Sequence, residues 1–138
     1  MRRMSDIIRN QNPLTMPPVT TVRQACQSMR QRKVGAVLVT DEQNHLLGIF
    51  TGRDAIGRVI ADGKNPDQTT LAQVMTPRPH TIPPERAAID ALRVMQDAGC
   101  RHVPIIDKGK VVGVVSKADF RGTEVDRLDE ETGLWERI

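Results

Sequence analysis

The sequence predicts a mixed α/β (α+β) fold made of two copies of one unit, each a small sheet with two packed helices. Three observations lead to this prediction. A seven-residue motif occurs twice, 65 residues apart. The same succession of apolar patterns precedes each copy. The chain of 138 residues is 38% hydrophobic and has only three aromatic side chains, so the core must be small and aliphatic.

The repeated motif reads G-h-h-[TS]-x-x-D, where h is an apolar residue. Its first copy is GIFTGRD at residues 48–54, and its second is GVVSKAD at residues 113–119. A short match of this kind is weak by itself. The regions around the two copies therefore have to agree as well.

Upstream of each motif, apolar residues recur at positions i, i+3, i+4 and i+7. This spacing places them on one face of an amphipathic helix. The first set is Val22, Ala25, Cys26 and Met29, and the second is Ala88, Ala91, Leu92 and Met95.

Two short apolar runs follow each predicted helix, separated by a polar turn. Such runs predict buried strands. They are residues 36–39 and 46–50 in the first copy, and 103–106 and 111–115 in the second. Each motif then opens a further predicted helix, over 54–60 and from 119 to about 125.

Each copy begins with a short helical segment, at residues 5–8 and 71–75, followed by a proline-rich stretch that favours extended chain. We therefore expect four parts. They are a first repeat with its N-terminal helix (1–62), a polar connector (63–70), a second repeat (71–125) and an acidic C-terminal tail (126–138).

The composition argues against several classes of partner and site. The net charge of +3 comes from scattered basic residues and not from a basic run, and few aromatic rings are present to stack on bases, so nucleic acid is not the favoured partner. The two cysteines form no C-x-x-C pair and the three histidines are dispersed, which argues against a metal site. No apolar run suggests a signal peptide or a membrane span, so we expect a cytoplasmic protein without membrane association.

The helix–strand–strand–helix order, the strand VPIID at 103–107 and the twin motifs resemble tandem CBS domains, the repeat of cystathionine-β-synthase, of which a pair forms a Bateman module. The resemblance covers about residues 4–125. It implies a stand-alone, non-catalytic regulatory protein whose two repeats are related by a pseudo-twofold axis, with two clefts between them. Such clefts bind AMP, ADP, ATP, NAD(H) or S-adenosylmethionine. The resemblance also implies a homodimer, an energy- or redox-sensing role and an unidentified regulated partner.

The motif itself has two interpretations. A Ser or Thr at a helix N-cap with an acid three residues later is a capping box, which is a structural feature. The same position can serve a ligand, because free backbone N–H groups at a helix start favour phosphate, and a carboxylate can accept both hydroxyls of a ribose. The sequence leaves both open.

The resemblance assigns roles to individual positions. Asp54 and Asp119 become ribose ligands and Thr51 and Ser116 phosphate ligands, with Arg53, Lys117 and Ala118 inside the motifs. In this family, the adenine side of each site comes from the other repeat. For the Asp119 site these positions are Thr20, Val34, Gly35 and Ala36, and for the Asp54 site they are Arg86, Cys100, Arg101, His102 and Val103.

The two predicted sites differ, because Arg86 stands where a small polar residue is expected and where the other site has Thr20. We therefore favour the Asp119 site. Arg101 and His102 would offer cations to phosphate, or form a plain surface pair at a strand start. Gly35 would allow close approach of a base, or simply make a turn.

Two other functions compete with nucleotide sensing. One is a structural CBS dimer with degenerate clefts that acts through its surface or its tail. The other is an enzyme, for which no nucleophile–base spacing or glycine-rich phosphate loop is found. Trp135, the only tryptophan, either packs on the protein or its dimer mate or belongs to a docking peptide.

Overall fold

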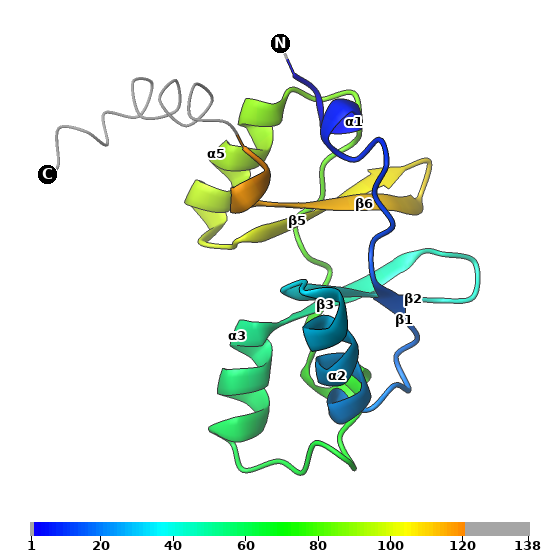
Figure 1. Ribbon diagram of the computed structural model, residues 1–138, viewed down its shortest axis with the longest axis vertical. Helices are drawn as coiled ribbons and strands as arrows, with labels where there is room; N and C mark the ends of the chain where they lie inside the picture. The colour runs from blue at the N-terminus through cyan, green and yellow to red at the C-terminus, as the bar shows by residue number, and fades with distance from the viewer. Residues whose placement is uncertain (1, 121–138) are drawn as a thin grey trace, which may run out of the picture. The chain divides into compact units, whose positions relative to one another are not determined.

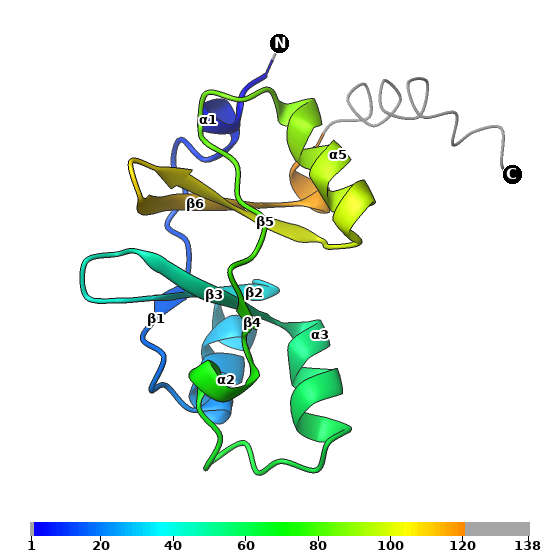
Figure 2. The ribbon, with the colours of Figure 1, turned by 180° about the vertical axis from the view of Figure 1, so that it is seen from behind.

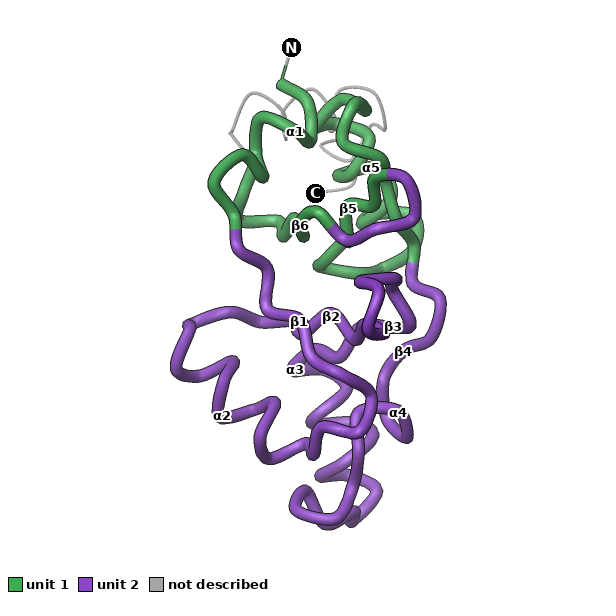
Figure 3. Tube along the Cα trace, turned by 90° about the vertical axis from the view of Figure 1, so that its right-hand side faces the viewer, with its two compact units in different colours: residues 1–11, 80–107, 112–138 green, residues 12–79, 108–111 purple. Residues whose placement is uncertain are grey.

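The computed structural model describes residues 2–120. The acidic tail with Trp135, and most of the helix predicted from Asp119 to about residue 125, lie outside the described residues. The chain forms two compact units, each described here by itself (Figure 3). Unit 1 takes residues 1–11, 80–107 and 112–138, and unit 2 takes residues 12–79 and 108–111.

Unit 2 contains a four-stranded sheet in the order β1-β2-β3-β4. The long strands are β2 (Ala36–Thr40) and β3 (Leu46–Thr51), which pair antiparallel as the apolar runs predicted. The edges are two-residue strands that the sequence did not predict. β1 (Thr15–Met16) is parallel to β2, and β4 (Thr76–Pro77) is antiparallel to β3.

Helix α2 (Val22–Arg32) confirms the first amphipathic pattern. It begins with a capping box between Thr21 and Gln24 and ends at Lys33, which adopts the left-handed conformation. The helix predicted at 54–60 is present as α3 (Gly52–Asp54), which continues as the π-helix η1 (Ala55–Ile60).

Both helices of unit 2 pack on the same face of the β2–β3 pair (Figures 1 and 2). The short helix α4 (Leu71–Val74) adds two further buried side chains. The resulting core is aliphatic apart from one phenylalanine that is fully buried. Its buried members are Val22, Ala25, Met29, Val37, Val39, Phe50, Val59, Leu71 and Val74.

Unit 1 repeats this plan with helix α5 (Ala88–Ala98) and the paired strands β5 (His102–Asp107) and β6 (Lys110–Ser116). α5 ends at Gly99 in the left-handed conformation that glycine tolerates best. Within the described residues, which end at Phe120, the motif here opens a single turn of 3₁₀ helix, η2 (Lys117–Asp119).

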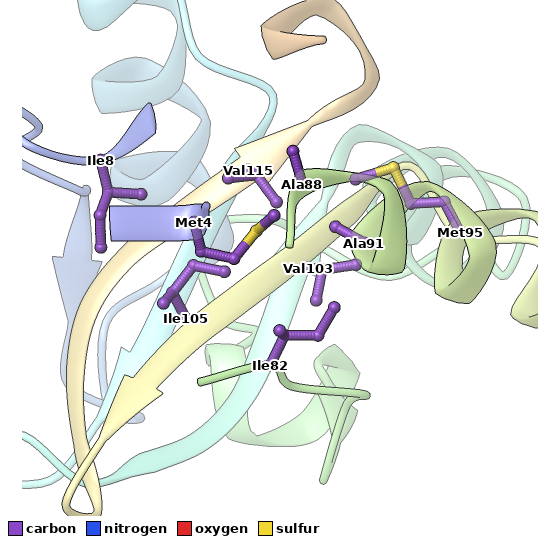
Figure 4. Packing of buried hydrophobic residues seen from close by; sticks show 9 residues of the cluster. All are labelled: Met4, Ile8, Ile82, Ala88, Ala91, Met95, Val103, Ile105 and Val115. Atoms are coloured by element: carbon purple, nitrogen blue, oxygen red, sulfur yellow. The ribbon is translucent and has the colours of Figure 1, made fainter. Parts of the chain in front are cut away.

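The core of unit 1 lies between its helices and the β5–β6 pair (Figure 4). Met4, from the short helix α1 (Met4–Ile7), is fully buried among the side chains of α5 and the strands. The buried cluster consists of Met4, Ile8, Ile82, Ala88, Ala91, Met95, Val103, Ile105 and Val115.

The short leading helices pack with the body of the opposite repeat. In unit 1, the Met4 amide donates to the Arg86 carbonyl oxygen (2.9 Å), and Arg3 forms an antiparallel β-bridge with Ala87. These contacts hold α1 against the start of α5. In unit 2, Thr21 forms an antiparallel β-bridge with Thr70, which holds α4 against the start of α2. Each unit is therefore built from one repeat and the leading helix of the other.

This arrangement explains the glycine of the repeated motif. A Cβ on Gly48 would lie 2.6 Å from the Met75 sulfur and 2.8 Å from the Thr76 carbonyl oxygen. A Cβ on Gly113 would lie 2.7 Å from Cγ2 of Ile8. All three distances are too short for real contacts, so each motif glycine makes room for the segment that follows a leading helix.

Candidate functional site

In unit 2 the motif forms a reciprocal N-cap. Thr51 caps α3, and its backbone N–H donates to Oδ2 of Asp54 (2.9 Å). The amide of Asp54 donates to the Thr51 hydroxyl oxygen at 3.4 Å. The capping interpretation of the motif is therefore confirmed here.

Asp54 is also held from outside its own turn. The hydroxyl of Thr76 donates to Oδ1 (3.1 Å), and Nε of Arg58 lies 3.6 Å from the same oxygen. Asp54 is buried, with 7% of its surface exposed. Both carboxylate oxygens therefore already have partners within unit 2, which leaves little capacity for a ligand.

In unit 1 the same motif is more open. The Ser116 amide donates to Oδ2 of Asp119 (2.7 Å), which completes the equivalent capping box. Asp119 is only half-buried, and its Oδ1 accepts no hydrogen bond from any residue that the structure describes. This carboxylate thus keeps one oxygen available.

Two cationic or titratable groups lie near Asp119. The guanidinium of Arg2 donates to the Asp119 carbonyl oxygen (2.9 Å). Burial lowers the pKa of the half-buried His102, while the Asp119 carboxylate acts in the opposite direction and Arg101 lowers it further. The Asp119 carboxylate therefore lies close enough to His102 to favour its protonated form.

The strand starts lie beside the motifs of their own units. In unit 2, Ala36 is the register partner of Thr51, with Val34 and Gly35 exposed just before the strand. In unit 1, His102 begins β5 and Ser116 ends the neighbouring strand β6.

The remaining predicted positions differ in how far their side chains are exposed to solvent. Arg101 is exposed, Cys100 is half-buried and Val103 is fully buried, so Val103 can offer only its backbone. Arg86 is exposed and pairs with Asp90 at 3.1 Å. Thr20 is half-buried, and its carbonyl accepts from the Leu71 amide.

The structure thus groups the predicted residues into two sets. Unit 1 holds Arg86, Cys100, Arg101, His102, Val103, Ser116, Lys117, Ala118 and Asp119. Unit 2 holds Thr20, Val34, Gly35, Ala36, Thr51, Arg53 and Asp54. The pairing of Asp119 with the Thr20 set, and of Asp54 with the Arg101 set, remains a prediction of the resemblance.

Sequence reasoning missed three residues that shape these sites. Arg58 stands four residues after Asp54 on the same predicted helix, so an i,i+4 pair could have been expected. Thr76 and Arg2 reach their partners from distant parts of the chain, and no local pattern marks them.

No helix within residues 2–120 combines the length and apolar character needed to cross a lipid bilayer.

Comparison with known proteins identifies one protein family. The CBS domain family model matches residues 4–61 and again residues 71–125. The CBS domain-containing protein CBSCBSPB3 of Arabidopsis thaliana is 40% identical over 123 residues, which is 89% of this chain and 22% of that protein. The chain thus spans about a fifth of the length of that relative.

Solved structures share the fold. The CBS domain protein PAE2072 of Pyrobaculum aerophilum, complexed with AMP, has a TM-score of 0.83 and 23% identity over 94% of this chain and 99% of its own. The CBS domain pair of MJ0100, in complex with 5′-methylthioadenosine and S-adenosyl-L-methionine, has a TM-score of 0.77 and 22% identity over 96% and 98%. With both repeats matched by the family model and the fold matched along nearly its whole length, the chain belongs to the CBS domain family and carries two CBS repeats.

Proposed function

We propose that this CBS pair is a non-catalytic regulatory module that binds an adenine-containing nucleotide, with Asp119 as the ribose ligand. The observation that carries the proposal is the half-buried Asp119 carboxylate, whose Oδ1 has no partner among the described residues. A carboxylate with an available oxygen suits the vicinal hydroxyls of a ribose.

The ligands in the structural relatives support an adenosine-containing compound. AMP is bound in one of them, and 5′-methylthioadenosine and S-adenosyl-L-methionine in another. All three contain adenine and ribose. For this chain the candidates are AMP, ADP, ATP, NAD(H) and S-adenosylmethionine, with no metal required.

Phosphate would be recognised near the same carboxylate in unit 1. His102 lies close to Asp119, and the exposed Arg101 and Lys117 flank them in sequence. Arg101 can contact phosphate oxygens with two parallel N–H groups. The Ser116 hydroxyl, which donates to Oδ2 of Asp119 at 3.3 Å, would be a further donor if it turned from that oxygen to a phosphate.

Asp54 is a weaker candidate for a second ribose site, because the Thr51 turn, Thr76 and Arg58 already hold its oxygens. Adding a ribose there would require at least one of these contacts to be replaced. We therefore propose one principal site per chain, at Asp119.

A thermal-shift panel tests the proposal, using AMP, ADP, ATP, NAD, NADH and S-adenosylmethionine. The test variant is Asp119→Asn, which keeps the side-chain shape and an oxygen for the Ser116 amide but removes the carboxylate. A ligand at a hundredfold excess over its dissociation constant should stabilise the wild type by about 2.7 kcal/mol. This stabilisation should fall to about 1.4 kcal/mol or less in Asp119→Asn, as expected for at least tenfold weaker binding, and should persist in Asp54→Asn.

A structural CBS dimer is the second candidate, because the capping boxes give both motif acids a purely structural role. In that case no compound in the panel would raise the unfolding temperature of the wild type. A homodimer and an unidentified regulated protein are expected for either function. Light scattering of the purified protein measures the first.

A further inference from the structure

A groove with an apolar base lies on the surface of unit 2, between α2 and η1. Its volume is about 460 Å³, within the range of roughly 300–1,000 Å³ that is usual for small-molecule sites. Val22, Cys26 and Val59 line it, and the two valines are almost fully buried. Every residue that lines the groove belongs to unit 2, and none of the residues assigned above to nucleotide binding is among them.

The groove follows two turns of α2. Cys26 and Arg30 come four and eight residues after Val22, so these three side chains share one face of the helix and span about 12 Å along its axis. The opposite wall comes from η1 and includes Val59 and Ile60. Ile60 is 73% exposed, so the groove presents a large apolar side chain to solvent along its length.

The two ends of the groove differ in charge. Arg30 lies in the last turn of α2, and its guanidinium forms no hydrogen bond or ion pair with any residue in the described part of the chain. At the other end, the Arg23 amide donates to the Pro66 carbonyl oxygen (3.1 Å), and the Arg23 guanidinium pairs with Asp67. Lys64 also lies at that end, where the Asp67 carboxylate reduces the net charge. The end at Arg30 is therefore the one that offers a cation without an anion.

An apolar strip that ends at one cation fits a ligand with an alkyl chain and one anionic group. The guanidinium of Arg30 can hold a carboxylate through two parallel N–H groups. The alkyl chain would gain from leaving water in proportion to the apolar area that it covers.

Other classes of ligand match this surface less well. A free phosphate or a nucleotide would leave the apolar strip uncovered, and a purely apolar ligand would leave the guanidinium of Arg30 unpaired. A peptide with acidic and apolar side chains would also press backbone N–H and C=O groups against apolar side chains that cannot bond them, which costs free energy. The groove therefore favours an aliphatic carboxylate.

We propose that the α2–η1 groove binds a fatty carboxylate, with the carboxylate on Arg30 and the alkyl chain along Cys26 and Ile60. Charge and polarity of the ligand then match the groove at both ends. The ligand would cover the exposed Ile60 side chain. Because unit 2 alone supplies the groove, binding would not depend on Asp119.

Calorimetric titration of the full-length protein with dodecanoate, below its micelle concentration, tests the proposal. The wild type and Asp119→Asn should each bind one dodecanoate per chain. Arg30→Gln should bind at least fivefold more weakly, whereas Arg9→Gln, which removes an exposed charge outside the groove, should stay within twofold of the wild type. Acetate, which lacks the chain, and dodecyltrimethylammonium, which has the opposite charge, should not bind at the same concentrations. Equal affinity in wild type and Arg30→Gln, equal binding of the cationic amphiphile, or no binding of dodecanoate would overturn the proposal.

The thiol of Cys26 gives an independent reading of where the ligand lies, because it lines the groove and is half-buried. Dodecanoate should slow its alkylation by iodoacetamide at least fivefold and leave Cys100, the other half-buried thiol, unchanged. Burial raises the pKa of Cys26, so the reaction is followed at alkaline pH, where more of the thiol is ionised. Equal protection of both cysteines, or of neither, would contradict binding in the groove.

A second copy of the chain is the competing occupant of this face. The proposal expects Ile60→Asp to weaken dodecanoate binding at least fivefold without changing the molar mass in light scattering. Val19→Asp, at a position that is equally exposed (76%) but outside the groove, should change neither quantity. A wild-type dimer that ignores dodecanoate and becomes a monomer in Ile60→Asp would show that a second copy covers the groove, and the proposal would be wrong.

Discussion

Asp54 and Asp119 occupy the same position of the same motif, yet their surroundings differ. Both close a capping box with the hydroxyl residue three positions earlier. Asp54 is additionally buried and bonded by Thr76 and Arg58, whereas Asp119 keeps one oxygen without a described partner. At the scale of single residues, one motif acid therefore serves mainly stability and the other is available to a ligand.

This difference predicts unequal losses of stability without ligand. Asp54→Ala removes the capping contact with Thr51 together with the acceptor of the half-buried Thr76 hydroxyl and the ion-pair partner of the exposed Arg58, and should lower the free energy of unfolding by about 2–4 kcal/mol. Asp119→Ala removes an N-terminal capping contact and should cost about 1 kcal/mol. Urea denaturation of both variants measures this. Equal losses would show that the two carboxylates contribute alike.

His102 gives a second prediction at this scale, in the pH dependence of stability. Because burial lowers its pKa, the folded protein takes up this proton less readily than the unfolded chain. The free energy of unfolding should therefore fall as the pH drops through the ordinary histidine range, near about 6.5.

The His102→Gln variant should lose less stability than the wild type between about pH 7.5 and pH 5.5. His80→Gln, a change at an exposed histidine, is the matched control and should follow the wild type. Urea midpoints across this range provide the measurement. Parallel curves for wild type and His102→Gln would contradict the assignment.

At the scale of elements, periodicity predicted the long helices and strands well. The apolar spacing that begins at Val22 and at Ala88 marks α2 and α5, and the four apolar runs become β2, β3, β5 and β6 with ends within one or two residues. β1 and β4 were missed because a two-residue strand has no periodicity and exists only through its tertiary partner. The π-helical form of residues 55–60 likewise has no signature in the apolar pattern.

At the scale of elements, we predict how alanine at each motif glycine changes stability. A methyl group at Gly48 meets the backbone oxygen of Thr76, which cannot turn aside as a side chain can. Gly48→Ala should destabilise unit 2 by about 1–3 kcal/mol through overpacking. Gly113→Ala should lose somewhat less, because its nearest neighbours are side-chain atoms of Ile8 and Gln11.

The matched control is Gly57→Ala on η1, where an added methyl group meets nothing within 4 Å. It should be neutral or stabilising, since alanine favours helical backbone more than glycine does. Thermal and urea unfolding of the three variants test this order. A Gly48→Ala protein as stable as Gly57→Ala would refute the packing role of the motif glycine.

At the scale of the whole molecule, sequence order and spatial grouping differ. The sequence predicts two consecutive repeats, but the leading helix of each packs with the body of the other. Nothing in the proline-rich stretches that follow these helices specifies which body they reach, because that choice depends on long-range packing. For the same reason, Thr76 and Arg2 could not be foreseen beside Asp54 and Asp119.

This grouping predicts which strands lose stability when a core side chain of α1 is truncated. Met4 is fully buried in the core of unit 1, so Met4→Ala should cost about 2–5 kcal/mol. Hydrogen exchange should show lost protection first at the amides of β5 and β6, not at those of β2 and β3. Leu71→Ala, its counterpart in unit 2, should give the reverse. Loss confined to β2 and β3 in Met4→Ala would contradict the grouping.

Binding of an adenine nucleotide through Asp119 is the central claim, and calorimetric titration tests it most directly. The compound with the largest thermal shift is titrated into wild type and Asp119→Asn under identical conditions. We expect one site per chain in the wild type and at least tenfold weaker binding in the variant, about 1.4 kcal/mol, with an unchanged unfolding midpoint in the absence of ligand. Equal affinity in the two proteins would contradict the role of Asp119, and no heat of binding with any adenine compound would leave a structural CBS pair as the correct account.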